Sequence, residues 1–161
     1  NSQPWKFVVV RQKNAELAKL AYGGNYDQVM EAPVTIALFT DTDLQRRARK
    51  IARVGGVQNF TEEQLQYFMQ NLPAEYARYN EHQISDYLAL NAGLVAMNLV
   101  LALTDQGIGS NIILGFDKSK VNEVLEIEER FRPELLITVG YAAEKVEPSY
   151  RLPVDEIIEK R

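Results

Sequence analysis

The chain has 161 residues, no cysteine and a formal net charge of -4. This length suits one domain, and the lack of cysteine excludes disulfides, zinc–thiolate sites, iron–sulfur clusters and a catalytic thiol. Negative charge argues against nonspecific nucleic-acid binding, which depends on cations that contact phosphates. We therefore expect a single domain over residues 1–161, with no nucleic-acid partner, in a reducing compartment such as the cytoplasm.

The first part of the chain alternates strand-like and helix-like segments. Residues 6–10, KFVVV, predict a short buried strand. Residues 14–25 predict one helix that ends at Gly23–Gly24. Residues 33–40 are rich in β-branched side chains and predict a second strand.

A basic cluster follows on a predicted helix that Asp43 can cap. Its cations are Arg46, Arg47, Arg49, Lys50 and Arg53. Apolar residues interleave with these cations at helical spacing, which is typical of the solvated face of an amphipathic helix. The alternative is a local anion site, for example for a dinucleotide phosphate.

The middle of the chain contains a break and a polar, aromatic segment. Residues 54–60 predict a glycine-containing break, and Thr61 with Gln64 forms a capping box that opens a helix. Residues 71–85 predict a partly helical, exposed segment that is a candidate lid. Nearby aromatic residues either line an acceptor site or pack against a neighbouring helix; they are Tyr67, Phe68, Tyr76 and Tyr79.

Residues 86–107 are the most apolar part of the chain. Asn91 and Asn98 interrupt this stretch, and its uninterrupted apolar runs fall short of the roughly 20 residues that a bilayer span needs. A helix that is apolar on nearly all sides is typical of a buried central helix or of a dimer core. We therefore expect no membrane partner.

The remaining residues predict two more strands and an extended tail. The strands are expected over residues 110–115 and 134–142, with a short helix capped by Asp117 between them. The long helix over residues 86–107 does not fit a simple βαβ series. The expected fold class is therefore α+β, with a small, mostly antiparallel sheet packed between helices.

Common side-chain motifs for catalysis or metal binding do not occur in this sequence. The one histidine, His82, accompanies neither a G-x-S-x-G motif nor metal-ligand spacing such as H-E-x-x-H. The segment GIGSNIILG, residues 107–115, follows a predicted helix and precedes a strand, which reverses the order of the dinucleotide fingerprint. An enzyme with this sequence would therefore rely on a cofactor for its chemistry.

Four segments resemble the nitroreductase family of flavin enzymes in their order and approximate spacing. NSQPWKFVVV, residues 1–10, resembles the family's loop-to-strand segment N-x-Q-P-W-x-F. The other segments are GGNYDQVMEAPVTIALF (23–39), GIGSNIILGFDKSKVNEVL (107–125) and PELLITVGYAAEKVEPSYRLPVDEII (133–158). The resemblance covers essentially the whole chain.

The resemblance implies a nitroreductase-like homodimer with FMN sites at the interface and a C-terminal tail that crosses to the partner protomer. It also implies that NADH or NADPH gives a hydride to flavin N5. In ping-pong order, a nitroaromatic, quinone or free flavin then takes the electrons. No catalytic side chain is implied. Family members carry an N-terminal helix and a basic, phosphate-binding segment ahead of this loop, so we expect the sequence to be truncated before Asn1.

The resemblance also implies which residues bind FMN. The backbone of Gly115, which follows Leu114, faces flavin N5 and O4, and glycine allows such a close approach. Gln28 offers its amide to the pyrimidine edge. Arg151 pairs with the phosphate. The family often has lysine where this chain has Ser149, so one phosphate charge is lost while a hydroxyl donor remains.

The opening loop is implied to reach the flavin of the opposite protomer. Its residues are Asn1, Ser2 and Gln3. Trp5 is expected in the core, because a large aromatic side chain beside a strand is usually buried.

Two other hypotheses remain open at this point. One is a noncatalytic flavin-binding or sensing module on the same fold. NAD(P)H would not reduce the flavin of such a module. The other is a dimeric helical interaction protein without a ligand, which would show no visible absorption band.

Overall fold

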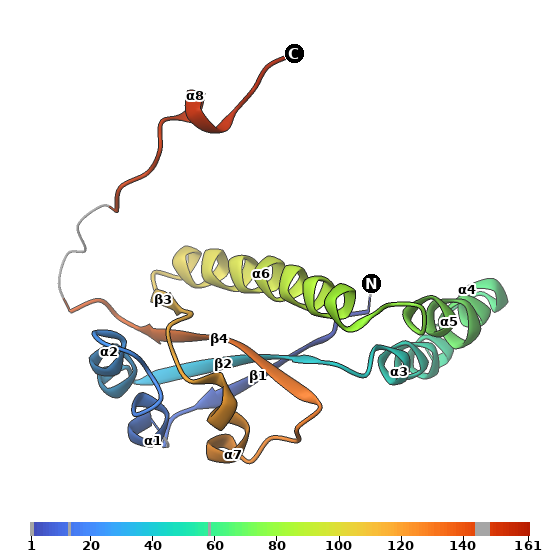
Figure 1. Ribbon diagram of the computed structural model, residues 1–161, viewed down its shortest axis with the longest axis horizontal. Helices are drawn as coiled ribbons and strands as arrows, with labels where there is room; N and C mark the ends of the chain where they lie inside the picture. Colours follow the sequence, from blue (N-terminus) through green and yellow to red (C-terminus); the bar gives the residue numbers. More distant parts are fainter. Residues whose placement is uncertain (1, 13, 58, 144–148) are drawn as a thin grey trace.

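A computed structural model describes residues 2–12, 14–57, 59–143 and 149–161. Its four strands form one antiparallel sheet in the order β1-β2-β4-β3 (Figure 1). The strands are β1 (Trp5–Val10), β2 (Val34–Asp41), β3 (Gly109–Ile113) and β4 (Phe131–Gly140). This sheet, with helices on both faces, confirms the predicted α+β class and the four predicted strands.

Short helices cover one face of the sheet (Figure 1). They are α1 (Asn14–Ala18), α2 (Asn25–Glu31), the 3-10 turn η2 (Lys118–Lys120) and α7 (Val121–Leu125). Alternation along β2 sends Ala37 and Phe39 toward these helices, where they join a buried cluster with Leu17 and Val29. Asp117 caps the η2 turn through the Ser119 N–H, as the sequence predicts.

The long helix α6 (Glu81–Asp105) covers the other face. Leu38 and Ile137 of the sheet pack with Ala92 and Ala96 of the helix. Trp5 is partly buried in this cluster, which confirms its expected place in the core. By length and composition α6 could cross a membrane, but core helices of other proteins pass the same test, so this is weak evidence.

A second group of helices lies beyond one end of the sheet (Figure 1). It consists of α3 (Leu44–Val57), α4 (Glu62–Gln66), the π-helix η1 (Tyr67–Asn71) and α5 (Leu72–Tyr76). Asp43 caps α3 through the Arg46 N–H, and the predicted capping box of Thr61 and Gln64 opens α4. Leu44, Ala48 and Leu88 form the core that ties this group to α6.

Three predictions of local structure are wrong. The break expected over residues 54–60 does not begin at residue 54, because α3 continues to Val57. The helix expected over residues 14–25 ends at Ala18, and a separate helix, α2, begins at Asn25. The segment over residues 71–85 is not exposed throughout, because Leu72, Pro73 and Tyr76 are buried.

The described part of the tail, residues 149–161, is exposed and includes the short helix α8 (Val154–Ile157). It extends away from the sheet and its helices in Figure 1.

Candidate functional site

The structure divides the residues implied to bind FMN into separate groups. Ser2 and Gln3 precede β1, whose first residue pairs with Thr40 near the end of β2. Gln28, in α2, lies near the beginning of β2, and β3 begins at the same end of the sheet (Figure 1). The pairing of Ile113 with Leu136, and of Leu136 with Ala37, places the end of β3 level with the middle of β2. In the strand order β1-β2-β4-β3, β1 and β3 are the two outer strands. Three strand spacings of about 4.8 Å place them about 14 Å apart across the sheet.

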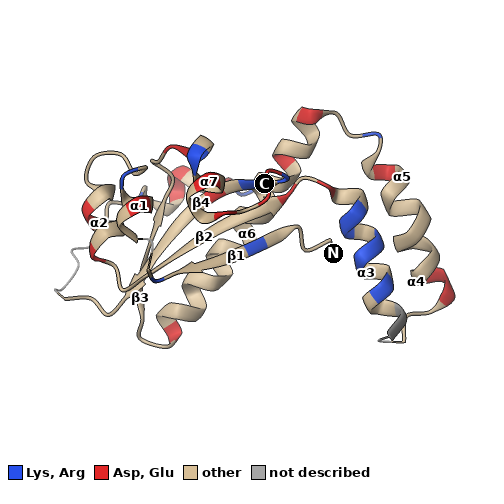
Figure 2. Ribbon diagram, turned by 90° about the horizontal axis from the view of Figure 1, so that it is seen from below, with Lys and Arg blue, Asp and Glu red and all other residues tan. Residues whose placement is uncertain are grey.

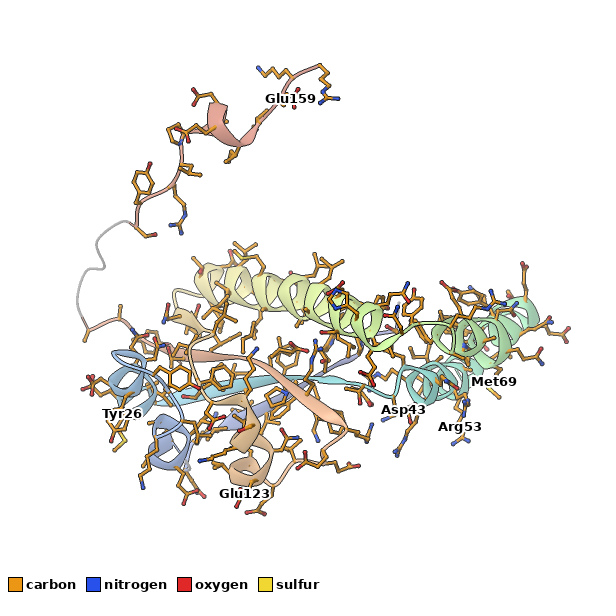
Figure 3. All side chains as sticks on the ribbon, viewed as in Figure 1. Tyr26, Asp43, Arg53, Met69, Glu123 and Glu159 are labelled. Atoms are coloured by element: carbon orange, nitrogen blue, oxygen red, sulfur yellow. The ribbon has the colours of Figure 1, made fainter. Side chains whose placement is uncertain are left out.

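Figure 3 labels one residue near each end of the sheet, Tyr26 in α2 and Asp43 before α3. Gln28 contacts Asn111 of β3, and Leu114 and Gly115 follow that strand, whereas Ser2 and Gln3 lead into β1 at the opposite edge of the sheet.

Gly115 lies in the turn after β3, against the start of α2. Its carbonyl accepts hydrogen bonds from the Tyr22 N–H (2.9 Å) and from Asn25 Nδ2 (3.2 Å). A Cβ atom at position 115 would lie 2.8 Å from Asn25 Nδ2. Within the described ranges, the Gly115 N–H donates no hydrogen bond. A larger residue at position 115 would therefore displace the Asn25 amide, and the turn leaves one backbone donor without a partner in the described residues.

A pair of amide side chains lies near this turn. The carbonyl of Gln28 accepts a hydrogen bond of 2.5 Å from Asn111 Nδ2 in β3. This arrangement leaves the amino group of Gln28, which is exposed, as a donor. A cavity of about 370 Å³ adjoins the pair, with Gly140 and Tyr141 also in its lining. Leu114 is 66% exposed and adds apolar surface beside these donors.

Ser2 is buried rather than presented to solvent. Its Oγ lies 2.7 Å from the hydroxyl of Tyr87, which lies 3.1 Å from the hydroxyl of Tyr76. Burial raises the pKa of the Tyr76 hydroxyl, so this group remains protonated at neutral pH. The Ser2 carbonyl accepts a hydrogen bond of 3.2 Å from Arg47 Nε. Ser2 therefore holds the loop to the protein through both its side chain and its backbone.

Gln3 has the opposite orientation. It is exposed, and its φ of 44° lies in the left-handed region that glycine favours. Its neighbours fix this conformation, since Ser2 and Pro4 are both buried and the Pro4 carbonyl accepts the Asp41 N–H at 2.6 Å. Strained backbone of this kind is often found at functional sites. Asn1, the third residue of this implied loop, lies outside the described residues.

Ser149 and Arg151 lie in the exposed tail. Arg151 Nη1 donates to Ser149 Oγ (2.6 Å) and to the Tyr150 carbonyl (2.8 Å). The structure does not bring either residue to Gln28 or Gly115. His82 is also exposed, with its ring 3.8 Å from Asp86 on the same helix, so it offers no catalytic pair.

The sequence reasoning missed Asn25, Asn111 and Tyr87 as contributors to this site. The position of Asn25 could have been predicted in part, because an asparagine after two glycines can stand at the beginning of a new helix as well as after the end of the preceding helix. The others act through contacts between residues far apart in the chain, for which the sequence carries no local pattern. Within the described residues, no group of three potential metal ligands is found.

These features define an α+β fold in which backbone and amide donors are gathered near one edge of the sheet. The model of the nitroreductase family matches residues 1–141, and the chain therefore belongs to the nitroreductase family.

Several relatives are similar along nearly the whole chain. A Streptococcus pyogenes protein named "Putative NAD(P)H nitroreductase Spy0809" is 62% identical over 100% of this chain and 80% of its own length. A nitroreductase family protein from Streptococcus pneumoniae TIGR4, solved by crystallography, is 88% identical with a TM-score of 0.97, over 99% of this chain and 80% of that one.

A third relative was crystallised with a ligand. It is a "putative nitroreductase in complex with FMN" from Exiguobacterium sibiricum 255-15. It is 27% identical to this chain, with a TM-score of 0.89, and the match covers 99% of this chain and 78% of that one.

Proposed function

We propose that this chain is one domain of an FMN-dependent NAD(P)H oxidoreductase that acts as a homodimer. The observation that carries the proposal is the free Gly115 N–H, beside the Gln28–Asn111 amide pair, in a fold with which a relative binds FMN.

The residues present fit an isoalloxazine ring. The ring needs a backbone donor for N5 and O4, and the Gly115 N–H is available at a position where a side chain would crowd Asn25. Its pyrimidine edge needs a donor and an acceptor, and an amide side chain such as Gln28 supplies both. The exposed Leu114 side chain offers apolar contact to the flat ring.

When bound, FMN would supply the redox chemistry, taking a hydride from NAD(P)H and passing electrons in a second half-reaction to a nitroaromatic, quinone or flavin-like acceptor. The chain's own groups position the ring and stabilise negative charge. A fixed N–H dipole such as that of Gly115 needs little reorganisation when the charge develops. In this proposal, Arg151 and Ser149 of the tail contact the phosphate.

A second protomer completes the site in this proposal. Ser2 and Gln3 lead into one edge strand of the sheet and Gly115 follows the opposite edge strand, so the loop of one protomer would contact the flavin held by its partner. The outer side of α6 supplies a surface for this association. Its exposed apolar residues are Leu90, Leu94, Met97 and Leu101. They recur every three or four residues, are 49% to 64% exposed, and lie opposite the side that packs on the sheet.

The proposal is tested by the visible spectrum of the purified full-length protein and by anaerobic addition of NAD(P)H. We expect a yellow protein whose flavin band bleaches. A yellow protein that neither NADH nor NADPH reduces would favour the sensing module. A colourless protein that also fails to bind added FMN would contradict both of these hypotheses and favour an interaction protein.

The phosphate contact is tested by Arg151→Ala. Loss of a charge-assisted hydrogen bond is expected to weaken FMN binding about tenfold or more. The dissociation constant is measured by the quenching of flavin fluorescence. Arg161→Ala is the matched control, because Arg161 is also an exposed tail arginine and pairs only with Glu159 in the described residues. Equal affinity in the two variants would remove Arg151 from the site.

A further inference from the structure

A second cavity, distinct from the edge at Gly115, lies between α3 and the opening loop. Its volume is about 350 Å³, within the range of about 300 to 1,000 Å³ that is usual for small-molecule sites. Gln3 forms part of its wall, so the cavity adjoins the loop that is proposed to meet the partner's flavin. Its other lining residues are Arg47, Lys50, Ile51, Val54, Gly55, Phe60 and Phe68.

One side of this cavity is cationic. Arg47 is half-buried and held by the Ser2 carbonyl, while Lys50 is exposed. Across the described ranges, neither residue forms an ion pair with a carboxylate. The basic residues of α3 are seen in blue next to the N-terminus in Figure 2. A guanidinium beside an ammonium is well suited to phosphate.

A neighbouring cavity shares these two cations and is also lined by Lys6, Arg46 and Arg130. It also has a volume of about 350 Å³, and its lining includes Asp41 and Glu128. Both carboxylates pair with Arg130, whose charge they largely compensate. Among its described lining residues the cavity beside Gln3 has no carboxylate, so an anion there would meet no like charge from them.

The other side of the cavity beside Gln3 is aromatic. Phe60 and Phe68 are stacked with their ring centroids 5.6 Å apart. Gly55 allows this arrangement, because a Cβ atom at that position would overlap the Phe60 ring. Phe68 belongs to the π-helix η1, and π-helical turns are frequent at functional sites. A purine base can stack on such a wall, as bases do on aromatic side chains elsewhere.

We propose that this cavity binds the adenosine phosphate half of the nicotinamide nucleotide, and that it favours NADPH through contacts of Lys50 and Arg47 with the 2′-phosphate. The inference rests on the proposed function, because the nicotinamide of the same nucleotide must reach the flavin near Gln3. From Arg47 to Val54 the helix advances about 10 Å, at 1.5 Å per residue. The 2′-phosphate near Arg47 and the adenine base near Val54 would therefore occupy different positions along α3.

The test is a calorimetric titration of the FMN-loaded protein with adenosine 2′,5′-bisphosphate, compared with adenosine 5′-phosphate. We expect the bisphosphate to bind more tightly. Lys50→Gln should weaken bisphosphate binding about tenfold and change adenosine 5′-phosphate binding far less. Arg53→Gln is the matched control, because it removes the same charge from the same helix but Arg53 does not line the cavity and points away from α6 (Figure 3).

Two results would overturn the inference. One is a bisphosphate that does not bind, or that binds no more tightly than adenosine 5′-phosphate. The other is a bisphosphate affinity that Lys50→Gln and Arg53→Gln change equally. Anaerobic flavin reduction by NADH and NADPH separates this failure from failure of the proposed function. If the flavin bleaches with either nucleotide while the titration fails, only the cavity assignment is wrong.

Discussion

At the scale of single residues, Gly115 accepts hydrogen bonds from two residues, Tyr22 and Asn25. Asn25 approaches it so closely that a side chain at position 115 would collide with the amide. The carbonyl of Gly115 is bonded to Tyr22 and Asn25, which fixes the direction of the adjacent peptide groups. The free N–H is therefore held in place by contacts that do not involve the ligand.

Gly115→Ala is expected to weaken FMN binding about tenfold or more, because the added methyl group displaces Asn25 and turns the donor. Flavin fluorescence titration measures the effect. Gly24→Ala is the matched control: a Cβ atom there meets nothing within 4 Å, and its φ of -62° is open to alanine. If Gly115→Ala binds FMN as tightly as Gly24→Ala, the N–H does not contact the ring.

The hydroxyl group of Tyr87 is a second single group with a large expected effect. Tyr87→Phe leaves the buried Ser2 hydroxyl without its partner, which should cost about 1–3 kcal/mol in the free energy of unfolding. Urea denaturation measures this loss. Tyr79→Phe is the control, because in the described residues the Tyr79 hydroxyl forms no hydrogen bond while its ring packs in the same cluster. Equal stability of the two variants would show that the Ser2–Tyr87 bond contributes nothing.

Some of these site residues could be predicted from the sequence and others could not. Gly115 and Gln28 could be assigned because the segments around them resemble a family. Asn25, Asn111 and Tyr87 could not, because each acts on a residue that lies 83 to 90 positions away in the chain. Such contacts depend on which strands pair and on how the helices pack, and no spacing in the sequence reports them.

At the scale of elements, strands and capped helices were predicted well, whereas glycines were misread. Gly55 was taken as part of a break, but α3 passes through it because the position is needed for close packing of Phe60. Gly23 and Gly24 were taken as the end of one helix, and they stand instead just before the next helix. Intrinsic propensity alone cannot distinguish a glycine that ends a helix from one that makes room for a neighbour.

The outer side of α6 supports a prediction about association. Leu94→Glu places a charge in the exposed apolar row and is expected to convert the dimer to a monomer. Light scattering after size-exclusion chromatography measures the mass. Ala102→Glu is the control, because Ala102 is exposed on the same helix but lies off the apolar row. A dimer that survives Leu94→Glu would show that this side of α6 is not the interface.

At the scale of the whole molecule, the sheet keeps the opening loop and the Gly115 turn apart. The α+β class could be predicted from the alternation of strands and helices. The separation of the two groups could not, because it depends on the strand order β1-β2-β4-β3, which places them at opposite edges of the sheet. In the proposed dimer, the opening loop of one protomer would meet the flavin at the Gly115 turn of its partner.

The central claim is tested most directly by sedimentation velocity of the FMN-loaded protein, recorded at both the protein band and the visible flavin band. We predict that all the protein-bound flavin absorbance sediments with the dimer, and that the monomeric Leu94→Glu variant carries none. Flavin that sediments with a monomer would contradict a site completed by two protomers.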